Sequence, residues 1–236
     1  MFDSGHKSRG IGYTTIAIPI LCAVFGGSLS GAEDFSNYRG LQFGMNLAAV
    51  AKQAGAKPTE ARFVHQRPAL IQEMDWRPRP PVLPSLASSD PVKEALLCFF
   101  NGELFRIVVT YDRYKIAGMT AADMIDAISL TYGTSTRPGG EIAYHSFYGE
   151  VAPVLARWED AEHSYNLVRT GDQSSFALVL YSKASDALAQ AAITEAVRLD
   201  AQEAPQREIE KQKKLQEAER SVLDKARSVN RPNFRP

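Results

Sequence analysis

Cysteine is scarce in this chain, which excludes a disulfide framework. The 236 residues include two cysteines, Cys22 and Cys98. Cys22 lies in an apolar N-terminal segment that we expect to be removed, so no internal disulfide can form in the mature chain. Its stability must then come from an ordinary hydrophobic core. Cys98 lies in the apolar run "ALLCFF", which predicts a buried small hydrophobe and not a reactive thiol.

Net charge and catalytic motifs are also lacking. Lys and Arg number 27 and are balanced by 27 Asp and Glu, so there is no electrostatic reason to expect nucleic acid or an anionic membrane as partner. A G-x-S-x-G nucleophile motif is absent. The glycine pair of "RPGGE" precedes a predicted strand, whereas a phosphate-binding loop opens a helix. The sequence therefore predicts no catalytic residue and no cofactor.

The segment "RWEDAEHSY" holds the densest group of polar side chains. Its potential metal ligands are Glu159, Asp160, Glu162 and His163. They straddle a predicted turn between strands, where charged residues are expected for solubility, and no second group with metal-ligand spacing accompanies them. We therefore predict no metal site. A hydrolase would need a pocket that brings His163 or Cys98 to a second catalytic group.

The first 32 residues are typical of an export signal. Lys7 and Arg9 precede the apolar run "IGYTTIAIPILCAVFGG", and small residues at Ser30 and Ala32 suit a signal peptidase. The run is short for an uncleaved membrane anchor, which is the alternative interpretation. We expect a mature chain that begins at Glu33, is periplasmic or secreted, and has no integral membrane span.

Two similar phrases predict amphipathic helices. In "GMNLAAVAKQAG", Asn46 is a good N-cap and Gly55 a typical C-terminal residue. In "GMTAADMIDAISLTYG", Thr120 and Asp123 have capping-box spacing, and Gly133 ends the apolar pattern.

Four short strand patterns follow each helix. The first set is "RFVHQ", "LIQEMDWR", "ALLCFFN" and "LFRIVVTYD", with Asn101–Gly102 as a hairpin turn between the last two. The second set is "IAYHSF", "PVLARWE", "SYNLVR" and "SFALVLYSK". In "LFRIVVTYD", Phe105, Ile107 and Val109 are expected on one face of the sheet.

The matched order predicts an α+β fold with a tandem repeat. Each unit has one helix and a four-stranded antiparallel meander, at about 40–112 and 113–184. Together they would form a two-layer domain over 33–184, with helices on one sheet face and the other face open. Pro78–Pro91 holds five prolines and is expected to be an extended surface connection.

The remaining residues predict helices of a different composition. Residues 185–204 are rich in alanine and are expected to dock on the domain, while Pro205 interrupts this helix or starts a new one. Residues 205–236 predict a charged, solvated helix with i,i+3 and i,i+4 ion pairs and a loose tail. Ile209, Leu215, Val222 and Leu223 give too thin an apolar seam to predict a coiled coil, and a solvated single helix is expected.

Aromatic and arginine side chains on the open sheet face would suit a protein partner. Trp, Tyr and Arg are enriched at the centres of protein interfaces. We therefore predict a partner-binding surface, and its residues are Trp76, Arg77, Tyr148, Arg157 and Trp158. The alternative places these aromatics in the core, because alternation along one strand does not tell which face is covered.

The layout over 40–183 resembles the fold of the beta-lactamase-inhibitor proteins, and the Gly-Met-polar phrase followed by a tryptophan strand is similar to small outer-membrane lipoprotein domains of that superfamily. The resemblance implies a concave antiparallel sheet that binds another protein and performs no chemistry. The chain lacks a lipid-attachment cysteine and a cysteine pair inside either repeat, and the charged C-terminal helix is additional.

Two functions follow from these predictions. The first is an exported, non-enzymatic binding protein of the cell envelope that engages an envelope or extracellular protein through the sheet face. The second is a structural or assembly protein whose charged C-terminal helix mediates association.

Overall fold

The computed structural model describes residues 1–2, 34–78, 90–138, 140–143, 151–170 and 175–235. The chain divides into two units, Met1–Ala32 and Glu33–Pro236. Most of the expected signal segment, most of the proline-rich connection, and Tyr148 lie outside the described residues. Among the described residues, every helix and strand belongs to the second unit.

Helices α1 (Leu47–Ala54) and α2 (Ala121–Tyr132) begin and end where the sequence predicts. The Asn46 side chain accepts a hydrogen bond from the Ala49 amide at 2.9 Å, and Gly55 closes α1 in the left-handed conformation. Thr120 and Asp123 form a reciprocal capping box at the start of α2. Both caps satisfy amide groups that have no partner within the helix.

All eight predicted strands are present, and a short hairpin precedes them. The hairpin consists of β1 (Asn37–Tyr38) and β2 (Leu41–Gln42). The strands of the first set are β3 (Arg62–His65), β4 (Ile71–Trp76), β5 (Val92–Phe100) and β6 (Glu103–Tyr111). Those of the second set are β7 (Glu141–Ala143), β8 (Val151–Glu159), β9 (His163–Thr170) and β10 (Ser175–Ser182).

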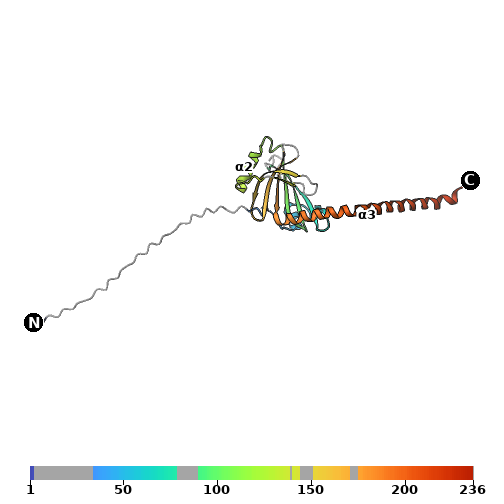
Figure 1. The fold of residues 1–236 in the computed structure, drawn as a ribbon, viewed down its shortest axis with the longest axis horizontal. Coiled ribbons are helices and arrows are strands. Elements are labelled where there is room, and N and C mark those ends of the chain that lie inside the picture. Colours follow the sequence, from blue (N-terminus) through green and yellow to red (C-terminus); the bar gives the residue numbers. More distant parts are fainter. Residues whose placement is uncertain (3–33, 79–89, 139, 144–150, 171–174, 236) are drawn as a thin grey trace. The chain divides into compact units, whose positions relative to one another are not determined.

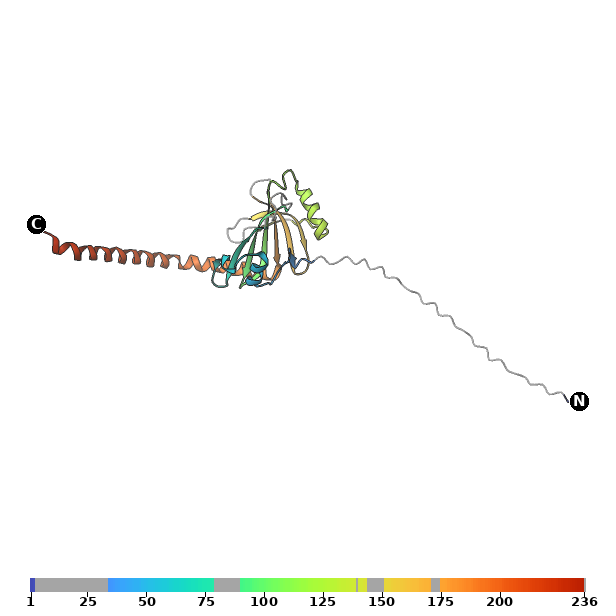
Figure 2. The ribbon, with the colours of Figure 1, turned by 180° about the vertical axis from the view of Figure 1, so that it is seen from behind.

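The eight strands form one antiparallel sheet, shown from two sides in Figures 1 and 2. Their order is β3-β4-β5-β6-β10-β9-β8-β7, so that β6 and β10 pair at its centre. Asn101 and Gly102, with φ of 51° and 85°, make the predicted tight turn from β5 to β6. The expected α+β class with a large antiparallel sheet is confirmed.

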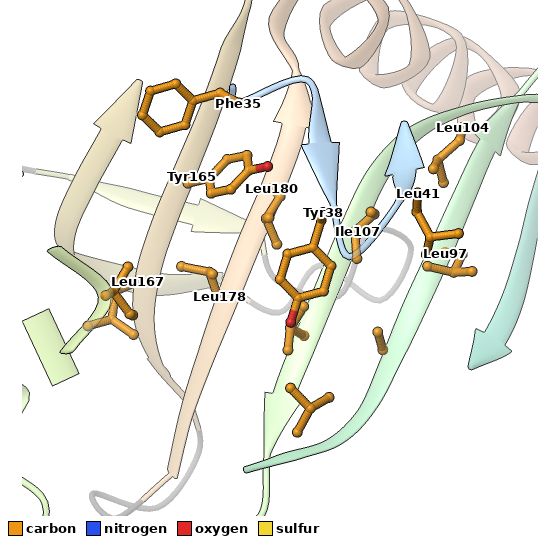
Figure 3. Packing of buried hydrophobic residues seen from close by; sticks show 14 of the residues in the cluster. Phe35, Tyr38, Leu41, Leu97, Leu104, Ile107, Tyr165, Leu167, Leu178 and Leu180 are labelled. Carbon is orange, nitrogen blue, oxygen red and sulfur yellow. The ribbon is translucent and has the colours of Figure 1, made fainter. Parts of the chain in front are cut away.

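The main core lies on the sheet face that carries the β1–β2 hairpin. Ile107 and Leu178 project from the central strands, and Tyr38 and Leu41 pack onto them from the hairpin (Figure 3). Helices α1 and α2 cover the same face. We call it the hairpin face. A register shift between Cys98 and Phe99 moves Phe105 to the opposite face, so the expectation that Phe105 shares a face with Ile107 is wrong.

The opposite face is also covered, which the two-layer prediction did not include. Val168 and Val179 have no exposed surface and pack with Ile142 of β7. Helix α3 (Lys183–Asn230) packs Ala189 against Cys98 and its neighbours. We call this the α3 face. The apolar run of β10 indicates in the sequence that both sheet faces are covered, because a strand buried on both faces is apolar throughout.

Helix α3 is continuous through Pro205, so the predicted interruption at that residue is wrong. Proline removes one helical hydrogen bond, at a cost of about 3 kcal/mol in a helix interior. Next to this point the Arg207 guanidinium donates to the Asp200 carbonyl at 3.2 Å and to its carboxylate at 2.7 Å. These bonds span the proline turn and stabilise the continuous helix.

Across the described residues, no helix combines the length and apolarity that crossing a membrane requires.

We expect Thr120→Ala to lower the free energy of unfolding by about 1 kcal/mol, because it removes the side-chain cap of α2. Thr131→Ala is the matched control, since Thr131 is exposed near the end of the same helix and caps nothing. Urea denaturation followed by circular dichroism measures both. Equal effects of the two substitutions would contradict a role for the capping box.

Candidate functional surfaces

Trp158 does not contribute to an open surface. It is 1% exposed, and its indole Nε1 donates to Ser129 Oγ at 3.2 Å and to the Gly133 carbonyl at 3.1 Å. Both acceptors belong to α2 or its C-terminal cap, so Trp158 packs beneath that helix. The prediction that Trp158 contacts a partner is therefore wrong, and the alternative that placed it in the core is correct.

The other members of the predicted surface are dispersed. Trp76 is half-buried against the main core, whereas Arg77 is exposed and pairs with Glu94 at 3.1 Å. Arg157 points to the α3 face, where its Nε donates to Asn166 Oδ1 at 2.7 Å. Strands β4 and β8 are five strand spacings apart, about 24 Å at the usual distance between strands. The described members therefore do not form one patch.

The α3 face is closed at its centre by a buried ion pair. Arg106 on β6 is 2% exposed, and its Nε and NH2 contact Asp186 Oδ1 at 2.7 and 2.6 Å. Its NH1 also donates to the Ala143 carbonyl at 3.0 Å, which ties β7 to the same point. Burial raises the pKa of Asp186, while the Arg106 charge acts in the opposite direction. Three elements, β6, β7 and α3, thus meet at one guanidinium.

Additional contacts hold the first half of α3 on the domain. Lys183 lies 2.8 Å from a Glu159 carboxylate oxygen and donates to the Asp160 carbonyl at 2.6 Å. Further along, Arg67 forms a bidentate ion pair with Glu203. Residues 204–235 are all exposed. The domain therefore anchors α3 as far as Glu203, and the rest of the helix is exposed.

The exposed half of α3 carries an apolar stripe. Leu215, Val222 and Val229 recur every seven residues and are 61%, 65% and 63% exposed. Ala218 and Ala226 lie between them on the same side of the helix, because residues three and four apart are neighbours on a helix surface. Isolated exposed apolar residues are ordinary, but a periodic row on an otherwise charged helix indicates a contact surface.

His163 and Cys98, the residues that a hydrolase would need, make packing contacts within the fold. His163 is 9% exposed and stacks on Phe43 with ring centroids 5.5 Å apart. Its Nδ1 lies 3.4 Å from Asp160 Oδ2. Cys98 has no exposed surface, as the sequence predicts, so a substrate cannot reach it. Within the described ranges, no three His, Cys, Asp or Glu side chains are grouped to hold a metal.

Comparisons with known protein families, curated proteins and solved structures return no match to this chain.

We expect Asp186→Ala to be strongly destabilising, because it leaves the Arg106 guanidinium buried without its carboxylate. The expected loss in free energy of unfolding is about 3 to 5 kcal/mol. Arg67→Ala is the control, since it breaks an exposed ion pair to the same helix and should cost far less. Chemical denaturation compares the two. A loss at Asp186 as small as that at Arg67 would contradict the anchoring role of the buried pair.

Proposed function

We propose that this protein is an exported, non-enzymatic binding protein of the cell envelope that self-associates through the exposed half of α3. The observation that carries the proposal is the row of Leu215, Val222 and Val229 on a helix segment whose residues 204–230 are all exposed. The open sheet face expected from the sequence offers less support, because the central strands are buried on both sides.

A second copy of the chain is the partner that this stripe suits. A seven-residue repeat places the same residues at the interface of two parallel helices. In that pairing Lys214 and Glu219 occupy the flanking positions whose charges meet across the interface, and their opposite signs are attractive. Upstream, Glu208 and Lys211 fall on the seam, so the paired segment begins near Leu215. Within it, Lys225 occupies a seam position between Val222 and Val229. The short seam predicts a weak dimer, with a dissociation constant on the order of 10–100 µM.

We also infer that the domain arose from a repeated unit of one helix and a four-stranded meander. The element order supports this, because α1 precedes β3–β6 and α2 precedes β7–β10. The strand order supports it as well, since the two meanders run toward each other and join at β6 and β10. Kinship with the inhibitor-protein fold remains a prediction.

Substitution on the stripe tests the association. In the unit Glu33–Pro236, Val222→Asp should abolish dimer formation, because a carboxylate would be buried between two helices. Leu223→Asp is the matched control, since it puts the same carboxylate at an exposed aliphatic residue about 100° around the helix, outside the seam and its flanking positions. Sedimentation velocity over about 5–500 µM measures both. A monomer throughout this range for the unmodified protein would overturn the proposal, as would dimerisation of the Val222→Asp protein.

Export has a separate test. When the full chain is expressed in a bacterium with a general secretion pathway, the mature protein should begin at Glu33, because Ser30 and Ala32 place small residues before that bond. Mass spectrometry of the periplasmic and medium fractions identifies the N-terminus. Ala32→Arg should block cleavage, whereas Glu33→Gln should not. Retention of residues 1–32 on an unmodified protein in the membrane fraction would support an uncleaved anchor instead.

A further inference from the structure

A cavity on the hairpin face lies apart from the α3 surface and has features of a small-molecule site. Its volume is about 320 Å³. It is bordered by α2, the β1–β2 hairpin and the adjoining ends of β5 and β6, and it is partly open to solvent. Apolar side chains from three segments line it, among them Ile116, Met119, Met124, Ile128 and Leu178. Volumes of this size lie at the small end of ligand pockets. The cavity therefore suits a molecule of one or two rings.

Three tyrosines supply the polar part of the lining. Tyr38 and Tyr132 approach from the hairpin and from α2, and Tyr111 stands at the end of β6. Burial raises the pKa of Tyr38 to about 12 and also raises those of Tyr111 and Tyr132, so all three phenols are neutral donors at pH 7.

Tyr165 does not line the cavity, and its hydroxyl has a hydrogen-bond partner within the protein. Tyr165 donates its hydroxyl proton to the Asn37 carbonyl at 3.0 Å. Among the described residues, the only buried side-chain polar atom without a partner is the amide nitrogen of Gln190, which lies elsewhere on α3. Tyr38, Tyr111 and Tyr132 line the cavity, so a ligand acceptor there can accept hydrogen bonds from their hydroxyls.

The rim of the cavity is positively charged. The Arg39 guanidinium contacts the two Asp90 carboxylate oxygens at 2.6 and 2.9 Å, and the Lys115 ammonium donates to the Asp90 carbonyl at 2.7 Å. Arg39 and Lys115 both line the cavity. Two cations against one carboxylate leave an excess of one positive charge at the rim, which attracts an anion.

We propose that this cavity binds a small aromatic carboxylic acid. The ring occupies the apolar floor, where the thioethers of Met119 and Met124 make favourable contacts with aromatic rings. The carboxylate points to the rim, toward Arg39 and Lys115, and accepts hydrogen bonds from the tyrosine hydroxyls. The single excess positive charge at the rim favours a monoanion. The ligand must also be small, because the cavity cannot hold a long acyl chain. The proposal does not depend on the association of α3.

Calorimetry with indole-3-acetate tests the site, and indole-3-ethanol is the neutral probe of matched shape. The chain from Glu33 forms a compact unit and is the protein to use. We expect a dissociation constant on the order of 10–100 µM for the acid and binding at least about 10-fold weaker for the alcohol. No binding of the acid, or equal binding of the two probes, would overturn the proposal.

Two pairs of variants locate the site. Ala127→Trp fills the cavity from α2 and should abolish binding, whereas Leu130→Trp adds the same bulk to the same helix at a residue that is 91% exposed. Lys115→Met should weaken binding of the acid about 10-fold without changing that of the alcohol. Lys52→Met on α1 is its control. Unchanged affinity for Ala127→Trp, with the melting temperature retained, would overturn this location.

Discussion

The antiparallel pairing of β6 with β10 is the constraint on which the other contacts depend. It sets Ile107 beside Leu180 on the hairpin face and Arg106 beside Tyr181 on the α3 face. The Arg106 guanidinium lies 5.4 Å from the centre of the Tyr181 ring and reaches both Asp186 and the Ala143 carbonyl. The β6–β10 pairing thus fixes where three elements pack. The hairpin contacts Ile107, and β7 and α3 both contact Arg106.

Burial of both sheet faces determines where the protein can present a contact surface. An antiparallel sheet with one solvated face offers that face to a partner. Here α1, α2 and the β1–β2 hairpin cover one side of the central strands, and β7 with the first half of α3 covers the other. Two features remain available in the described fold: the exposed half of α3, with its apolar stripe, and the tyrosine-lined cavity. They lie on different elements, so association and ligand binding can be separated by mutation.

Several structural features were predicted correctly because their signals are local. Asn46, Thr120 and Asp123 cap helices through bonds to residues three positions away, and Asn101–Gly102 forms a turn through its own backbone preferences. The candidate surface was predicted less well. The role of Trp158 depends on which face of β8 is covered, and the cavity combines residues that are distant in the sequence, such as Tyr38, Tyr111 and Tyr132. The β1–β2 hairpin was missed because two-residue strands have no measurable periodicity.

The sequence by itself determined the α+β class, the order and approximate limits of its strands and capped helices, and the buried state of Cys98. Propensity, capping and alternation act over a few residues, which is why they can be read from the sequence. Only the tertiary structure decided that β6 pairs with β10, that α3 runs unbroken through Pro205, and that Arg106 is neutralised by Asp186, 80 residues away in the chain. These features depend on contacts between distant segments, and a pattern within one segment carries no information about which distant segment will cover it.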